Sequence, residues 1–329
     1  MSRRAPRIAV VIPAFNESAT IATVVGAFRE ALSEATIFVI DNNSSDATAD
    51  LARAAGAEVR AERLQGKGHA VRRAFADLEA DVYVLVDGDD TYDAAAAPAM
   101  VQMLVDQHLD MVTGVRANTE KAAYRPAHWF GNTILTGLVR YVFGDRTSDM
   151  LSGYRVFSRR FIKSFPALSA GFETETEFTV HALELNMPIG EIRTRYKSRP
   201  SGSVSKLRTI RDGVRILRTI FLLAKEEKPL QLFSIASAIL MAAGLLLGLP
   251  VVLEFSRTGL VPRLPTAVLA TGLVLLSCLS ATAGLILDTV TRGRREMKRL
   301  AYLAIPATEG TRMNAPAPAG ASENRTLVA

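Results

Sequence analysis

Two long uncharged stretches near the C-terminus constrain the fold of this chain more than any other feature. Residues 231–253 and 264–287 contain no Asp, Glu, Lys or Arg. Each is longer than the ~20 apolar residues that a helix needs to cross a bilayer. Buried core helices are the alternative, but two adjacent segments that are apolar all round fit a membrane better. The sequence therefore predicts a hairpin of two transmembrane helices within residues 230–290.

The charges that flank this hairpin predict its orientation. The connection, residues 256–263, is short enough for only a tight turn outside the bilayer. Because basic residues accumulate on the cytoplasmic side of membrane proteins, the basic segment after the second stretch is expected in the cytoplasm. Two spans return the chain to its starting side, so residues 1–202 are also expected there, in a multi-pass protein of the plasma (inner) membrane. The basic residues are Arg292, Arg294, Arg295, Lys298 and Arg299.

Amphipathic segments predict further contact with the bilayer. In residues 203–229, apolar residues recur at helical spacing with basic residues between them. This pattern is typical of a helix on a membrane surface, although packing against a soluble domain is an alternative. Residues 129–142 have a similar apolar pattern, and the Pro-Ala repeats after Pro306 predict a disordered tail within residues 291–329.

The overall charge and the single cysteine exclude several kinds of site. The net charge is +6, and 49% of the residues are hydrophobic. With two expected spans, an anionic bilayer is a better partner for this positive charge than nucleic acid. Cys278 is the only cysteine, so the chain can form neither an intrachain disulfide nor a thiolate metal site.

Residues 1–202 alternate between short apolar runs and segments with helical periodicity. This alternation is typical of βαβ units and a parallel sheet, so a domain of the α/β class is expected. The expected strands are residues 8–12, 36–40, 57–61, 82–86 and 111–115, and the expected helices are residues 20–32, 46–55, 68–78 and 100–107.

Polar motifs follow three of these strands directly. PAFNE occupies residues 13–17, DNNSSD residues 41–46 and DGDD residues 87–90. Because parallel strands end at the same edge of a sheet, and open α/β sheets bind ligands there, the three loops are expected to form one site. A solvated turn would explain any one of them, but not three at one edge.

The acidic loop has the ligand chemistry of a divalent metal site. Asp87 and Asp89 are two residues apart and point to the same side if the strand geometry continues. Mg²⁺ and Mn²⁺ prefer carboxylate oxygens, and Mg²⁺ often takes only one or two from the protein when a substrate supplies phosphates. Asp90 would either contact a sugar or face solvent.

In this order, the motifs resemble those of the family 2 glycosyltransferases, which have the GT-A (Rossmann-like) fold. The likeness also rests on GKGHAVRRAF at 66–75, DMLSGYR at 149–155 and RPSGSVSK at 199–206. It is closest to the branch that transfers sugars to polyisoprenyl phosphates, such as dolichol-phosphate mannose synthase and the bactoprenol glucosyltransferases. The acceptor loop of that branch reads roughly Asp-x-x-Gly-x-Phe-Arg, whereas here Tyr154 replaces Phe and Gly153 lies one place late.

The resemblance implies several groups of site residues in this sequence. Those expected to bind the nucleotide sugar are Pro13, Asn16, Glu17, Asp41, Lys67, Asp87 and Asp90. Those expected to hold the metal are Asp87 and Asp89. Those expected to face the lipid phosphate are Arg155, Arg199, Ser203 and Lys206. Asp89, Asp149 and Arg155 would be catalytic, with Asp149 orienting the acceptor, contributing near the metal or accepting a proton.

The chemistry of such a transfer agrees with these residue types. A divalent ion neutralises the charge that develops on the departing diphosphate. A lipid phosphate is already ionised at pH 7, so it needs orientation by Arg and Lys rather than a strong base. Its attack opposite the leaving group predicts inversion. The resemblance to the bactoprenol enzymes implies a UDP-hexose as the favoured donor and a polyprenyl phosphate as the acceptor. Related enzymes also imply a homo-oligomer.

Several alternatives remain open at this point. A processive membrane polysaccharide synthase usually has a Gln-x-x-Arg-Trp motif, and Trp129 does not stand in that context. A sugar nucleotidyltransferase would have a similar sheet but usually no spans, and a non-catalytic membrane scaffold would not need the acidic loop. Glu173 and Glu175 would either stabilise a helix N-terminus through its dipole or contact the donor or acceptor.

Overall fold

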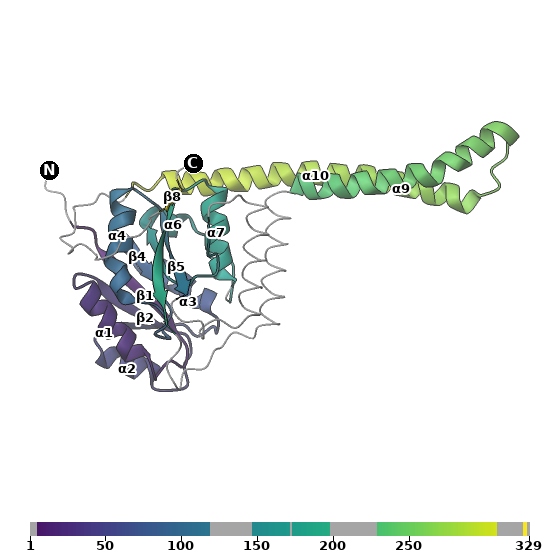
Figure 1. Ribbon diagram of the computed structural model, residues 1–329. Helices are drawn as coiled ribbons and strands as arrows, with labels where there is room; N and C mark the ends of the chain where they lie inside the picture. The colour runs from purple at the N-terminus through teal and green to yellow at the C-terminus, as the bar shows by residue number, and fades with distance from the viewer. Residues whose placement is uncertain (1–4, 119–146, 172, 198–228, 308–324, 328–329) are drawn as a thin grey trace. The chain divides into compact units, whose positions relative to one another are not determined.

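The computed structural model describes residues 5–118, 147–171, 173–197, 229–307 and 325–327 (Figure 1). The chain divides into two compact units, one made of Met1–Ile220 with Lys298–Ala329 and the other of Phe221–Met297. Apart from Pro229, the two predicted amphipathic segments lie outside the described residues, as do Arg199, Ser203 and Lys206. The predicted division at residues 202, 229 and 290 stays a prediction.

Within the described residues, the first unit contains an eight-stranded sheet in the order β3-β2-β1-β4-β6-β5-β7-β8. The four strands from β3 to β4 pair in parallel, and helices connect them, so the predicted βαβ units are confirmed. The elements of this half are β1 (Ile8–Ala14), α1 (Ile21–Ala31), β2 (Thr36–Asp41), α2 (Thr48–Ala54), β3 (Glu58–Ala61), α3 (Lys67–Asp77) and β4 (Val82–Leu85).

The other half of the sheet is mixed rather than parallel. Strand β6 runs antiparallel to both of its neighbours, β4 and β5, whereas β5 and β7 are parallel to each other. The expectation of a parallel sheet therefore holds only for the first half. The elements here are η1 (Ala94–Ala96), α4 (Ala97–Asp106), β5 (Met111–Asn118), β6 (Arg155–Ser158), α6 (Arg159–Ser164), α7 (Thr174–Glu184), β7 (Ile189–Tyr196) and β8 (Arg325–Leu327).

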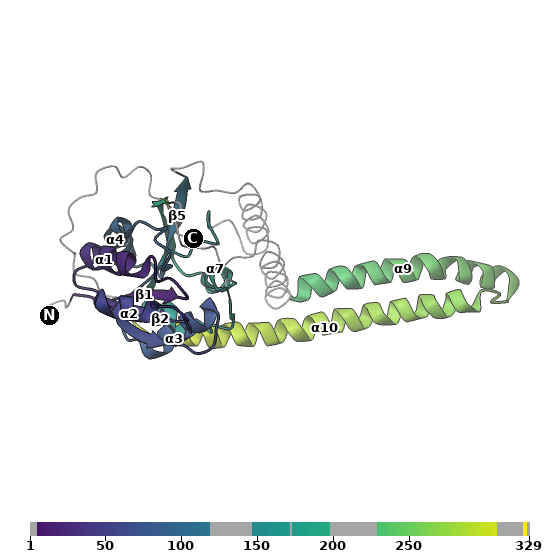
Figure 2. The same cartoon turned by 90° about the horizontal axis from the view of Figure 1, so that it is seen from below.

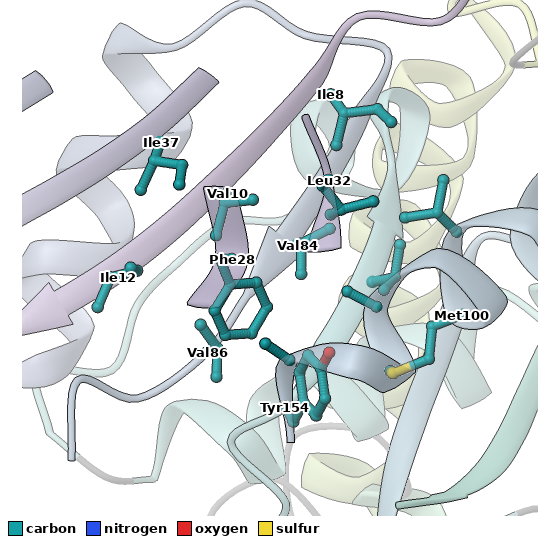
Figure 3. Close-up of a cluster of buried hydrophobic side chains, with 14 of the residues drawn as sticks. Ile8, Val10, Ile12, Phe28, Leu32, Ile37, Val84, Val86, Met100 and Tyr154 are labelled. Carbon is teal, nitrogen blue, oxygen red and sulfur yellow. The ribbon is translucent and has the colours of Figure 1, made fainter. Parts of the chain in front are cut away.

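Alternate strand residues enter two hydrophobic clusters, one on each face of the sheet. Val10 belongs to the cluster drawn in Figure 3, which α1 covers through Phe28. Val11, the next residue, belongs to the opposite cluster, which α3 covers through Phe75. Burying a side chain of this size stabilises the fold by roughly 1.5–3 kcal/mol. The two clusters hold the strands in register, so the polar loops are brought to one edge of the sheet.

The second unit is a helical hairpin. Helices α9 (Pro229–Thr258) and α10 (Leu264–Leu303) lie side by side (Figure 2), and both are long and apolar enough to cross a membrane. Small residues let the two helices approach, since Ser237 Oγ lies 3.0 Å from Ser277 Oγ. A Cβ on Gly244 would lie only 2.9 Å from a methyl of the other helix. The predicted pair of apolar helices is therefore confirmed.

The second helix of this hairpin continues beyond the predicted span. The sequence predicted an end near residue 290, but α10 runs through the basic segment to Leu303. Arg, Lys, Glu, Met and Leu are all strong helix formers, so the helix continues where the hydropathy falls. The turn before α10 contains Gly259 at a φ of +68°, a left-handed conformation that glycine adopts without strain.

The last turns of α10 belong to the first unit and contact its α/β domain. Lys298 Nζ lies 2.6 Å from Glu184 Oε2 at the end of α7. The Tyr302 hydroxyl donates to the fully buried Asp110 at 2.8 Å, and Arg160 pairs with the same carboxylate. These contacts attach the last turns of α10 to the α/β domain.

Candidate active site

The loops after β1 and β2 are bound to each other, as the sequence predicted for neighbouring strand ends. Asn16 adopts a left-handed φ of +50°, and its Oδ1 accepts a hydrogen bond of 2.8 Å from the amide of Ser45. The amide of Glu17 donates to Thr48 Oγ1 at 2.8 Å. Pro13 lies in β1 itself, beside Ile40 of β2. The PAFNE and DNNSSD loops therefore form one wall.

Asp41, at the end of β2, presents an acceptor atom. Its Oδ1 is buried and receives no hydrogen bond from any group in the described part of the chain. The next residue, Asn42, is buried and ties down the following loop, because its Oδ1 accepts from Gly66 N at 2.6 Å and its Nδ2 donates to Leu64 O at 2.7 Å. An unsatisfied buried acceptor marks a position where a ligand donor would be stabilising.

The GKG segment starts α3 in close contact with the loop before α7. A Cβ on Gly66 would collide with the carbonyl oxygen of Ala170, and one on Gly68 would lie 2.7 Å from the carbonyl carbon of Ser169. Glycine is required at both positions because the two backbones approach so closely. This packing brings Lys67, which lies between the two glycines, to the edge of the sheet.

Lys67 joins two carboxylates from different elements. Its Nζ donates to Asp87 Oδ1 and, at 2.5 Å, to Glu175 Oε1. Only 8% of its side chain is exposed. Burial by itself lowers the pKa of Lys67, but the two carboxylates outweigh that effect, so the pKa is raised above its ordinary value. The group is therefore a fixed positive charge at neutral pH.

The acidic loop after β4 offers two carboxylates in different settings. Asp87 is partly exposed, whereas Asp89 is only 4% exposed and accepts a hydrogen bond of 2.6 Å from Thr91 Oγ1. Asp90 is partly buried at a left-handed φ of +55°. Within the described ranges, no three acidic, histidine or cysteine side chains gather as a metal site. Two carboxylates fit a Mg²⁺ or Mn²⁺ ion whose other ligands come from a diphosphate and water.

Asp149, in the predicted acceptor loop, forms a bidentate ion pair with Arg116. The distances are 2.8 Å from Nε to Oδ2 and 2.7 Å from Nη2 to Oδ1. Burial raises the pKa of Asp149, but the Arg116 guanidinium lowers it by more, so the pKa lies below its ordinary value. The sequence reasoning missed Arg116. The sequence did contain a sign of its role, because Arg116 directly follows the predicted strand MVTGV, which ends at the sheet edge where the acidic loops lie.

Arg155, the other end of this loop, is not at a surface that a phosphate could reach. It is fully buried, and its guanidinium donates to the carbonyls of Met150 at 2.5 Å and Ser152 at 3.1 Å and to Thr179 Oγ1 at 3.0 Å. Burial lowers its pKa to about 10. The expectation that Arg155 faces phosphates is corrected here, because its donors hold the loop in shape.

The acceptor loop packs directly on the acidic loop through Gly153. A Cβ on Gly153 would lie 2.9 Å from Asp87 Cγ, and the amide of Gly153 donates to the Tyr92 hydroxyl at 2.9 Å. The position of the glycine, one place later than in the family pattern, thus has a structural reason. Asp87 is in contact with Lys67 on one side and with the acceptor loop on the other.

The glutamates that open α7 make specific contacts. Glu175 holds Lys67, and Glu177 accepts hydrogen bonds from the amides of Leu168 at 2.9 Å and Ser169 at 3.0 Å. Glu173 precedes the helix, and its Oε2 is buried with no partner in the described part of the chain. Glu175 and Glu177 therefore do more than stabilise the helix dipole.

The structure thus has amide and acidic loops at one edge of a parallel half-sheet, beside the buried Lys67 and a loop that Arg116 binds. Residues 9–165 match the model of glycosyl transferase family 2. The chain belongs to this family, and it transfers a sugar from a nucleotide sugar.

Curated relatives agree with this assignment. Glycosyltransferase AglJ of Haloferax volcanii is 34% identical over 250 residues, which is 75% of this chain and 82% of that protein. The dolichyl-phosphate hexose transferase of the same organism is 25% identical over 221 residues, or 67% of this chain and 95% of that protein.

Solved structures confirm the GT-A type of fold. Glucosyl-3-phosphoglycerate synthase from Mycobacterium tuberculosis has a TM-score of 0.55 at 23% identity, over 67% of this chain and 80% of that chain. A further structure of that enzyme, with a TM-score of 0.53 at 22% identity over 65% and 79% of the two chains, contains Mn²⁺ and UDP-glucose.

Proposed function

We propose that this protein transfers a hexose, with inversion, from a UDP-hexose to a polyprenyl phosphate at the cytoplasmic face of the inner membrane. The observation that carries the proposal is the contact of the acceptor loop, through Gly153, with Asp87 of the acidic loop. The same chain also carries two helices of membrane-spanning length. A relative named as a dolichyl-phosphate hexose transferase supports the acceptor class.

The donor half of the site would hold the nucleotide sugar along one wall. Asp41 Oδ1, which is buried without a partner among the described residues, would accept from a ribose or base. Lys67 would meet the diphosphate, and Asp90 the sugar. A Mg²⁺ or Mn²⁺ ion held by Asp87 and Asp89 would neutralise the leaving diphosphate. The remaining proposed wall residues are Pro13, Asn16 and Glu17.

The acceptor half of the site would orient a lipid phosphate. Arg116 has the forked guanidinium that suits phosphate, and Asp149 holds it in place through two hydrogen bonds. Because a phosphate monoester is ionised at neutral pH, Asp149 is needed as a positioning group more than as a base. Arg155 would maintain the loop. Arg199, Ser203 and Lys206 remain proposed phosphate contacts.

The proposal is tested by a transfer assay on the purified full chain in detergent. The protein would meet undecaprenyl phosphate and labelled UDP- and GDP-sugars, with Mg²⁺, Mn²⁺ or a chelator. Label is expected in the organic phase with one UDP-hexose and only with metal. Transfer to water-soluble acceptors alone, or no transfer by protein that still binds a nucleotide sugar, would contradict the proposed acceptor.

A further inference from the structure

Lys67 already places a positive charge beside the carboxylate that would bind the metal. Its ammonium bonds both Asp87 and Glu175, so the carboxylate of Asp87 is engaged by a side chain of the protein itself. A lysine whose only role was to bind a phosphate would need no bond to Asp87. A divalent ion that binds Asp87 must therefore compete with the Lys67 ammonium.

The position of this ammonium is set by the fold. Glycines on both sides of Lys67 pack against the loop before α7, and Glu177 holds the backbone of that loop through two amides. Glu175, two residues before Glu177 in the first turn of α7, is only 4% exposed. For Lys67 to leave Asp87, its side chain must either break its bond to Glu175 or change its rotamer within a buried space.

We propose that Lys67 acts as an internal cation that keeps Asp87 closed to a free divalent metal, so that the metal enters together with the donor diphosphate. The inference rests on the proposed function of this site. A metal that arrives alone must displace the ammonium from Asp87 or lie close to it, and like charges repel. A diphosphate offers oxygens to both cations, so Asp87 can then turn to the metal.

Glu175 is the positioning residue of this arrangement. Its carboxylate also bonds the ammonium, and it shares the attraction that Lys67 would otherwise direct to Asp87 alone. If Glu175 lost its charge, Lys67 would bind Asp87 more tightly. Loss of Lys67 and loss of Glu175 charge should therefore change the affinity for free metal in opposite directions.

The test measures Mn²⁺ binding to the full chain in detergent by electron paramagnetic resonance. Binding is measured without nucleotide, with UDP and with GDP. The wild type is expected to bind Mn²⁺ alone weakly and at least about tenfold more tightly with one nucleotide. Lys67→Met should bind Mn²⁺ alone about tenfold more tightly than the wild type and lose most of the nucleotide effect. Glu175→Gln should bind Mn²⁺ alone more weakly than the wild type.

Two further variants control the experiment. Arg72→Met removes the same charge from the same helix, but Arg72 is exposed and contacts His69. It should leave free Mn²⁺ binding as in the wild type. Lys67→Arg keeps the cation and should keep the weak binding of free metal, which tests the idea even if Lys67→Met does not fold.

The outcomes separate this inference from the proposed function. Equal affinity of the wild type, Lys67→Met and Arg72→Met for free Mn²⁺ would overturn the internal-cation role and leave the proposed transfer intact. Tight binding of free Mn²⁺ by the wild type would do the same. A wild type that binds no Mn²⁺ even with UDP and GDP would overturn the metal site itself.

Discussion

Asp87 is the single residue on which most of the site depends. It is bonded to Lys67, it lies against Gly153 of the acceptor loop, and it precedes the buried Asp89 by two positions. A change of its charge therefore acts on the donor side and the acceptor side together. Asp89 is more specialised, because its contact with Thr91 fixes the turn of the acidic loop.

Asp87→Asn and Asp89→Asn are each expected to reduce sugar transfer by at least about a hundredfold, because each removes a charge that the metal and diphosphate need. Asparagine keeps the shape of the side chain, so the fold should persist. Asp77→Asn, which changes a carboxylate paired with Arg73 on α3, is the matched control and should keep normal activity. Full transfer by either site variant would remove that residue from the metal site.

Arg155 has a structural role that predicts a loss of stability on substitution. In Arg155→Met the buried carbonyls of Met150 and Ser152 lose their donors, at about 1–3 kcal/mol each. The free energy of unfolding should fall by roughly 2–5 kcal/mol, as measured by denaturant unfolding in detergent. Arg159→Met, which loses only an exposed pair with Glu79, should change it by less than about 0.5 kcal/mol. Equal stability of the two variants would show that Arg155 does not hold the loop.

The sequence indicated some of these site residues and not others, for a physical reason. Asp87, Asp89 and Asp41 follow apolar runs directly, so strand periodicity alone places them at one sheet edge. One of the two partners of Lys67, Glu175, lies 108 residues away, and the pair of Arg116 and Asp149 spans 33 residues. Such contacts depend on the strand order and the loop path, which local patterns do not determine.

Helix α7 is the element in which burial and charge are most closely combined. All of its residues from Thr174 to Leu183 are buried, although several of them are polar or charged. His181 is packed against Phe161 and Phe165 and lies 3.1 Å from Ser164 Oγ. Burial, with a smaller effect from Lys298, lowers the pKa of His181 to about 3.

This histidine predicts a pH dependence of stability. Between the ordinary histidine pKa of 6.5 and about 3, the unfolded chain binds a proton that the folded chain does not. Stability from His181 is therefore complete above pH 6.5 and is lost as the pH falls, by about 2 kcal/mol between pH 7.5 and pH 5. Denaturant unfolding should show this loss in the wild type.

The matched variants separate His181 from other titrating groups. His181→Phe should remove about 2 kcal/mol of the fall in stability between pH 7.5 and pH 5. His108→Asn, at an exposed position with a φ of +52°, should retain the wild-type dependence. An unchanged dependence in His181→Phe would contradict the buried neutral histidine.

Helices and strands with a local residue pattern were predicted from the sequence. The direction in which the strands pair was not. The strands from β1 to β5 and the helices between them follow from apolar periodicity. The antiparallel insertion of β6 between β4 and β5 was not predicted. The direction of a short apolar strand depends on the loop before it, and Arg155 fixes that loop through contacts within the fold.

At the scale of the whole molecule, α10 takes part in both units. Its apolar part pairs with α9, and its last turns, from Lys298 onward, belong with the α/β domain. Lys298 pairs with Glu184, whose side chain is 2% exposed, and Tyr302 donates to the buried Asp110. The end of α10 therefore gives each of two buried carboxylates of the α/β domain one more hydrogen-bond donor.

A truncation tests this dependence. A chain that ends at residue 228 lacks the hairpin and also Lys298 and Tyr302, so the buried Glu184 and Asp110 each lose one hydrogen-bond donor. A second chain, in which a long Gly/Ser linker replaces residues 229–297, removes the hairpin but keeps Lys298 and Tyr302. The first should be less stable than the second by on the order of 2 kcal/mol, or a Tm lower by about 4–8 °C.

The comparison also separates anchoring from folding. Both truncated chains should bind the membrane less firmly than the full chain, because both lack the apolar helices and keep only the predicted amphipathic segments, while only the chain with the linker should keep the stability of the domain. Adding Lys298→Met and Tyr302→Phe to the linker chain should bring its Tm down to that of the shorter chain. Equal Tm values for the two unmodified truncations would mean that the α/β domain folds independently of α10, and membrane attachment would then be the only role left for the second helix.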